Sequence, residues 1–332
     1  MRYKAREMSW ATYEPDLAIR VAAAAVGATV VIVGVAIGAY ALGSFLLMGK
    51  HVSAREVGAS LRALVRELWI AGWTQPLIPL FYLVGHRMDG FFVRRGREGI
   101  AKAKADAKAE AKAEANADAL AVATSEAVEH GGVPVIFVHG YMQNRVGFLG
   151  LARTLARQGL GPLFGFNYPW FASMPSNAAR LERFVERICK ETGSAVVDLV
   201  CHSMGGLVAM EMMRDEASHE KLKVRRCVTI ATPHAGVMWR GPLIGIGATA
   251  LRRGSKLLEA HAGAKLAVPC LSVYSSHDNI VHPKESSSLA LRGGRDVEVV
   301  GLAHLAILFS PQVADHVAAF LAEPDPDDAA SS

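Results

Sequence analysis

Three residues of the sequence have side chains that together could carry out acyl transfer, and they occur in the order Ser203, Asp278, His304. Acyl transfer needs a hydroxyl nucleophile, an imidazole that takes its proton, and a carboxylate that holds the imidazole in the right tautomer. Each of the three residues follows an apolar run typical of a buried strand: "SAVVDLVC", "AVPCLSVY" and "DVEVV". Since the carboxyl ends of parallel strands meet at one edge of a sheet, we expect these side chains to lie together.

The segment "DLVCHSMGG", Asp198 to Gly206, predicts a strand, a tight turn and a helix, with Ser203 at the bend. Cys201 stands where a nucleophile elbow of the form G-x-S-x-G has its first glycine, so either residue is a candidate nucleophile. As the last residue of a buried strand, Cys201 should keep a protonated, unreactive thiol. We therefore expect Ser203 to be the nucleophile and Cys201 to fill a small space behind the elbow.

Other polar residues near these positions have simpler interpretations. Asp296 begins the strand that precedes His304 and is the alternative acid. Asp198 lies within a strand, where we expect it to bind backbone. His202 is next to the nucleophile but is expected to point away from it. Three further histidines are near the site in sequence but are not expected to act as the base: His234, His277 and His282.

The elements that would position these residues alternate between strands and helices from residue 132 onward. The predicted strands are 133–140, 162–169, 194–203, 225–233, 267–276 and 296–301, and the predicted helices are 144–158, 177–191, 204–216 and 311–323. This alternation predicts the α/β class, with a mostly parallel sheet covered by helices on both faces.

These motifs resemble the α/β-hydrolase-fold lipases and esterases, particularly the bacterial lipase-like members, over about residues 132–323. "FVHGY" is similar to the strand-end HG motif, "CHSMGG" to the nucleophile elbow, and "ATPHAG" to the segment that leads into a cap. "SSHDNIVHP" and "AHLAILFSP" are similar to the loops that bear the acid and the histidine. The resemblance implies a catalytic domain at 131–323, oxyanion donors at the backbone amides of Tyr141 and Met204, and a cap at 235–267.

The N-terminal third has a different composition. Residues 21–48 carry no charge and predict a membrane span, and residues 68–85 predict a second span or an interfacial segment, so residues 1–95 form a membrane anchor. Gly34 and Gly38 form a GxxxG motif that could join two copies. With two spans, the basic flanks place the catalytic half in the cytoplasm, at a bacterial inner membrane. An Ala/Lys/Glu-rich spacer follows at 96–130, and an acidic tail ends the chain at 324–332.

Charge and cysteine content narrow the choice of partners. Residues 1–100 hold 12 Lys and Arg against 7 Asp and Glu, and the remainder is balanced, so the net charge of +5 belongs to the anchor and suits phospholipid better than nucleic acid. The four cysteines lack metal-type spacing and are expected to be core thiols: Cys189, Cys201, Cys227 and Cys270.

Together these features predict a membrane-anchored serine hydrolase that cleaves lipid-like or other apolar carboxylic esters, with no metal or organic cofactor. A thioesterase or acyltransferase of the same fold is the nearest alternative. The alternative from a different class is a non-catalytic, membrane-tethered binding or scaffold protein.

Overall fold

A computed structural model describes residues 15–49, 56–74, 132–214, 222–238 and 245–324 of the chain. Most of the predicted catalytic domain and the first predicted span fall within these ranges. The predicted spacer, residues 75–85 of the second predicted span and the tail beyond residue 324 lie outside them.

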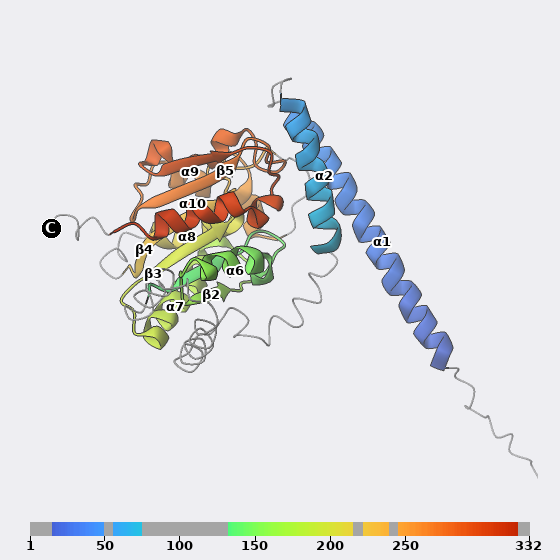
Figure 1. The fold of residues 1–332 in the computed structure, drawn as a ribbon, viewed down its shortest axis with the longest axis horizontal. Helices are drawn as coiled ribbons and strands as arrows, with labels where there is room; N and C mark the ends of the chain where they lie inside the picture. Colours follow the sequence, from blue (N-terminus) through green and yellow to red (C-terminus); the bar gives the residue numbers. More distant parts are fainter. Residues whose placement is uncertain (1–14, 50–55, 75–131, 215–221, 239–244, 325–332) are drawn as a thin grey trace, which may run out of the picture.

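A six-stranded sheet forms the centre of the C-terminal domain (Figure 1). Its strands are β1 (Val135–Val138), β2 (Leu163–Phe166), β3 (Val197–His202), β4 (Val224–Ile230), β5 (Cys270–Ser275) and β6 (Arg295–Val299). Their order is β2-β1-β3-β4-β5-β6, and every neighbouring pair is parallel. All the strand carboxyl ends therefore lie at one edge.

Helices cover both faces of this sheet. They are α6 (Leu149–Arg157), α7 (Met174–Thr192), α8 (Met204–Met213), α9 (Lys256–Ala262) and α10 (Pro311–Leu321), with short 3-10 turns η4 (Arg145–Phe148), η6 (Gly247–Leu251), η7 (Lys284–Ser287), η8 (Ala290–Arg292) and η9 (Ala306–Phe309). Leu199 of β3 packs into the hydrophobic cluster formed with α7 and α8. Its neighbour Val200 packs into the cluster formed with α6 and α10, because successive strand side chains point to opposite faces. The predicted parallel, doubly covered sheet is thus present.

Two helix starts differ from their predicted positions, and local capping explains both. Asn144 accepts a hydrogen bond from the Val146 N–H and begins a 3-10 turn, so α6 starts only at Leu149. Helix α7 starts at Met174, before the predicted residue 177, because Ser173 caps it and a proline occupies its first turn.

Of the predicted cap at 235–267, the structure describes residues 235–238 and 245–267. This segment contains η6 and α9, and Val237 pairs with Arg252 in an isolated bridge. Val237, Leu251 and Leu258 pack into the same cluster as α8. The role of this segment over the site stays a prediction.

The N-terminal helices α1 (Pro15–Met48) and α2 (Val57–Thr74) pack against each other beside the sheet domain (Figure 1). Across the described part of the chain, no helix combines the length and apolarity needed to cross a membrane, and the predicted span 21–48 is not supported. Most of the second predicted span, residues 75–85, lies outside the described residues. Helix α2 includes Arg62, Arg66 and Glu67 among its apolar residues.

Candidate active site

Ser203 lies at the sharp turn between β3 and α8. Its backbone has φ 53° and ψ −124°, a combination that is strained for a residue with a side chain and that recurs at functional sites. Two close approaches surround the turn. A Cβ on Gly205 would overlap the carbonyl oxygen of Val138, and one on Gly206 would overlap the Thr232 hydroxyl. The turn therefore needs glycine at both positions, and its geometry points the serine side chain away from the strand end, toward His304.

Ser203, His304 and Asp278 form one hydrogen-bonded chain. His304 Nε2 lies 2.9 Å from Ser203 Oγ, and His304 Nδ1 lies 2.8 Å from Asp278 Oδ2. The other carboxylate oxygen of Asp278 accepts the N–H groups of Ile280 and Val281, each at 2.8 Å. A carboxylate facing Nδ1 favours the tautomer with the proton on Nδ1, which leaves Nε2 to accept the serine proton.

The charge of Asp278 also sets the basicity of His304. Burial alone would lower the pKa of His304, but the Asp278 carboxylate and its hydrogen bond, followed by the Glu67 carboxylate, raise the pKa above its usual 6.5. Ser203 and His304 are each only 7% exposed, so this charge interaction is weakly screened by water.

The loop after β1 approaches the serine closely. A Cβ built on Gly140 would lie 2.9 Å from the Cβ of Ser203. Tyr141 follows Gly140 directly, and Met204 follows Ser203, so both predicted oxyanion residues flank this contact. Their donor role stays a prediction.

Two buried histidines, His202 and His139, support the loops that contain Gly140 and His304. The sequence pattern assigns neither of them a catalytic role. His202 Nε2 lies 3.0 Å from the His304 carbonyl oxygen, and His202 Nδ1 lies 3.0 Å from Gln143 Oε1, which also accepts the Gly140 N–H at 3.1 Å. His202 therefore points away from the serine hydroxyl and links the Gly140 loop to the His304 loop. Burial, and then the nearby His304, lower the pKa of His202 well below 6.5.

His139 fixes the other side of the Gly140 loop. Its Nδ1 donates to the Gly140 carbonyl at 2.9 Å, and its Nε2 accepts the Tyr168 N–H at 3.3 Å. The Tyr168 ring stacks on the imidazole, with 4.2 Å between centroids. Burial lowers the pKa of His139 to about 4, so the ring is neutral and can serve as both donor and acceptor.

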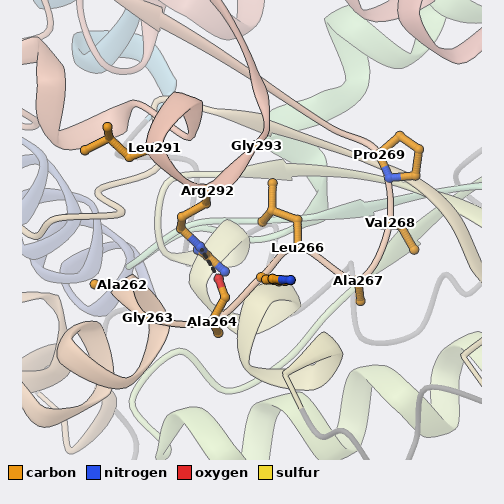
Figure 2. A pocket seen from close by; sticks show the side chains of 11 residues that line it. Ala262, Gly263, Ala264, Leu266, Ala267, Val268, Pro269, Leu291, Arg292 and Gly293 are labelled. Atoms are coloured by element: carbon orange, nitrogen blue, oxygen red, sulfur yellow. Dashed lines mark hydrogen bonds between the residues drawn. The ribbon is translucent and has the colours of Figure 1, made fainter.

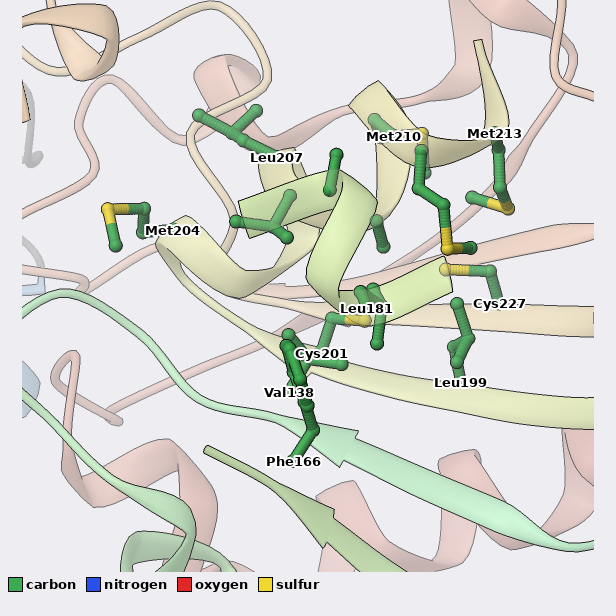
Figure 3. Packing of buried hydrophobic residues seen from close by; sticks show 14 of the residues in the cluster. Val138, Phe166, Leu181, Leu199, Cys201, Met204, Leu207, Met210, Met213 and Cys227 are labelled. Carbon is green, nitrogen blue, oxygen red and sulfur yellow. The ribbon is translucent and has the colours of Figure 1, made fainter. Parts of the chain in front are cut away.

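Cys201 lies in the hydrophobic cluster beneath the elbow (Figure 3). It is fully buried, and all four cysteines are free thiols. The adjacent Cys201 thiol is the largest cause of the raised pKa of Cys227, and Cys227 in turn raises that of Cys270. Cys201, Cys227 and Cys270 lie in one hydrophobic cluster with Leu199 and Met210, and these surroundings favour the protonated form of Cys227 and Cys270.

The alternative candidates have other partners. Asp296 accepts the Ser288 hydroxyl and the Leu289 N–H, away from His304. Asp198 forms a bidentate ion pair with Arg225 at 2.6 and 3.0 Å, and it also has the backbone contact expected from the sequence, a hydrogen bond from the backbone of Arg226. His234 forms a hydrogen bond with Thr229, and His277 forms hydrogen bonds with Ser276 and Gly301.

Among the residues that the structure describes, no group of three or more potential ligands could hold a metal ion.

A hollow of about 610 Å³ is lined by residues 262–269 and 291–293. Figure 2 shows the side chains of these residues. Val268 and Pro269 directly precede β5, so the hollow lies at the amino end of that strand. Arg292 crosses it and donates to the Ala264 carbonyl at 3.0 Å. The serine and histidine follow strand carboxyl ends, at the opposite edge of the sheet. This hollow is therefore not the substrate pocket of the site.

Solved lipase structures share this architecture. The mature form of the Bacillus licheniformis lipase BlEst2 matches with a TM-score of 0.50 at 16% identity, over 57% of this chain and 92% of that chain. Aspergillus fumigatus lipase B matches with a TM-score of 0.53 at 17% identity, over 60% of this chain and 55% of that chain. A family described as a domain of unknown function, DUF7379, matches residues 99–239. The chain has the α/β-hydrolase fold.

The sequence interpretation missed two residues that contact the histidine loop. Asn279 Oδ1 accepts the His304 N–H at 3.1 Å, and Glu67 of α2 accepts the N–H groups of Leu305 and Ala306. Asn279 directly follows Asp278 in the sequence, so its position next to the predicted acid could have marked it as a residue of the site. Glu67 is 238 residues from Leu305, and no local pattern indicates that contact.

Proposed function

We propose that the protein is a serine hydrolase that cleaves carboxylic esters of lipid-like or other apolar substrates. The observation that carries the proposal is the hydrogen-bonded chain from Ser203 through His304 to Asp278, with the serine at a strained turn. Strain at that position is retained where the backbone must present a nucleophile, and a packing role alone does not require it.

In this mechanism Ser203 Oγ attacks the ester carbonyl while its proton passes to His304 Nε2. Asp278 stabilises the resulting imidazolium, and the amides of Tyr141 and Met204 bind the oxyanion. His304 then gives the proton to the leaving alkoxide, which departs as the alcohol. Water, deprotonated by His304, then attacks the acyl carbonyl. The bond to Ser203 Oγ breaks, the acid leaves, and His304 returns the proton to Ser203 Oγ.

Aromatic side chains beside the Gly140 loop support an apolar substrate. Tyr141 packs edge-on against Trp170 at 5.0 Å between centroids, and Trp170 against Phe171 at 5.6 Å. Phe171 is 56% exposed and Ile246, whose N–H bonds the Phe171 carbonyl, is 75% exposed. An acyl chain in contact with this row would remove apolar surface from water.

Labelling with a fluorophosphonate probe tests the proposal. The native chain should label, and Ser203→Ala should not. Ser194→Ala, which changes a serine near the opposite end of the same strand, is the matched control and should label normally. A native chain that folds but neither labels nor turns over any ester would favour the non-catalytic binding protein.

A substrate series then separates the enzyme classes. We expect turnover of p-nitrophenyl esters to rise with acyl length. Faster turnover of acyl thioesters would indicate a thioesterase, and transfer to an added alcohol in preference to water would indicate an acyltransferase.

We propose in addition that the α1–α2 hairpin holds the enzyme at a membrane surface, with the catalytic domain in the cytoplasm. Support comes from exposed apolar side chains on α2, where Leu61, Val65 and Trp69 are 60%, 61% and 76% exposed beside Arg62 and Arg66. The full chain should sediment with anionic vesicles, and a reporter fused at residue 332 should report the cytoplasm. Binding unaffected by Trp69→Glu, or a periplasmic reporter signal, would contradict this placement.

A further inference from the structure

Glu67 is a buried carboxylate outside the serine, histidine and aspartate chain. It is 3% exposed, on the face of α2 that packs against the sheet domain. Its Oε1 accepts the Leu305 N–H at 2.9 Å, and its Oε2 accepts the N–H groups of Leu305 at 3.2 Å and Ala306 at 2.9 Å. Leu305 directly follows His304, so this carboxylate fixes the backbone on the carboxyl side of the base.

Helix α1 provides a second contact on the same loop. The Ser44 hydroxyl accepts the Asn279 amide N–H at 2.8 Å, and Asn279 Oδ1 accepts the His304 N–H at 3.1 Å. Ser44 and Asn279 are both buried. Because Asn279 follows Asp278, this chain fixes the acid and the base relative to each other.

An apolar contact completes the attachment. Ala303, which directly precedes His304, is fully buried in a small cluster with Phe45 and Met48 of α1 and Ala63 of α2. The hairpin therefore holds the histidine loop on both sides of His304, by packing at residue 303 and by backbone hydrogen bonds at residues 305 and 306.

The charge of Glu67 also reaches the base. Burial raises the pKa of Glu67 to about 7, while the backbone bonds from Leu305 and Ala306 and the nearby His304 act to lower it. The Asp278 carboxylate also acts on Glu67, and it raises the pKa. In the opposite direction, the Glu67 carboxylate favours the protonated form of His304.

We infer that the α1–α2 hairpin is part of the active site and that Glu67 is a positioning residue for His304. The inference depends on the proposed hydrolase function. In this arrangement, docking of the hairpin holds His304 at hydrogen-bond distance from Ser203, and the Glu67 carboxylate strengthens His304 as a base.

The test compares Glu67→Gln with Glu182→Gln in the full chain. Glu182 is an exposed carboxylate on α7, so its substitution controls for the loss of one negative charge. We expect Glu67→Gln to lower kcat by about 10- to 100-fold with little change in KM, because small displacements of a catalytic group have effects of this size. The acid limb of the kcat/KM profile should move to lower pH, since His304 loses a neighbouring negative charge. Glu182→Gln should leave kcat and the acid limb unchanged.

The Glu67→Asp variant distinguishes the effect of the carboxylate's position from the effect of its charge. It keeps the carboxylate but shortens its reach, so the acid limb should stay near its native pH while kcat still falls. If Glu67→Gln does not fold, Ser44→Ala, which removes only the hydroxyl that holds Asn279, should lower kcat in the same way. Native kcat and a native acid limb in Glu67→Gln would overturn the inference, as would native kcat in Ser44→Ala.

An NMR titration of His304 tests the role of Glu67 independently of the proposed hydrolase function. Its pKa should be lower in Glu67→Gln than in the native chain, whether or not an ester is turned over. A native chain without fluorophosphonate labelling, together with this fall in the His304 pKa, would contradict the hydrolase and retain the contact. A labelled native chain with an unchanged His304 pKa in Glu67→Gln would contradict the role of Glu67 alone.

Discussion

Gly140 and Ser203 come so close together that a methyl group on Gly140 would lie 2.9 Å from the serine Cβ. The same methyl group would lie 3.0 Å from Gln143 Oε1 and 3.2 Å from His202 Nδ1. The loop after β1 and the nucleophile turn are therefore fitted to each other with only hydrogen atoms between them. A change at Gly140 must move one of these two loops.

The first prediction concerns this contact. Gly140→Ala should lower kcat about 100- to 1000-fold, because displacing the loop moves the Tyr141 amide away from the oxyanion. Gly147→Ala is the matched control, since a Cβ there meets nothing within 4 Å, and it should keep native kcat. Both variants are compared by ester hydrolysis and thermal unfolding. Full activity in a folded Gly140→Ala protein would show that this loop supplies no oxyanion donor.

The second prediction assigns the acid. Asp278→Asn should lower kcat by about four orders of magnitude, because an amide does not hold His304 in the tautomer that accepts the serine proton. Asp296→Asn should retain most activity, since Asp296 binds Ser288 and Leu289 instead. The two variants are compared in a steady-state ester assay. The reverse pattern would make Asp296 the acid.

These assignments show how much of the site the sequence could predict. Ser203, Asp278 and His304 each follow a predicted strand, and parallel strands bring their carboxyl ends to one edge, so proximity could be expected from the pattern. The link between Gln143 and His202 could not be predicted, because their shared hydrogen bond depends on how two loops pack. Glu67 falls in a segment whose composition predicts an anchor. Nothing in local periodicity links it to Leu305, since that contact exists only after α2 docks.

The third prediction concerns stability at low pH. Burial depresses the pKa of His139 to about 4 and that of His234 to about 3, and lowers that of His202 as well. A depressed pKa gives stability that is complete above about 6.5 and is lost as pH falls, because the unfolded state then binds more protons. For His139 alone the change from 6.5 to about 4 corresponds to roughly 3 kcal/mol.

Glu67 acts in the opposite sense, since its raised pKa gives stability that is present below about 4.5 and is lost as pH rises through about 7. Three histidines with lowered pKa values act against this one carboxyl group, so we expect the free energy of unfolding to fall as the pH is lowered from 6.5 to 4. Urea unfolding at closely spaced pH values measures this. A free energy that is constant or rises over that interval would contradict the buried, neutral state of these histidines.

The last prediction concerns Cys201. If its side chain only fills the space beneath the elbow, Cys201→Ala should keep most activity, because Ser203, His304 and Asp278 are untouched. The free energy of unfolding should fall by about 1 kcal/mol from lost packing. Cys201→Leu should be far less active and less stable, since the extra methylene groups would have to fit into the fully buried cluster that contains Leu199 and Met210. Thiol reagents should leave the native enzyme active, because the cysteine is fully buried. A folded Cys201→Ala variant as inactive as Ser203→Ala would instead assign the chemistry to the cysteine.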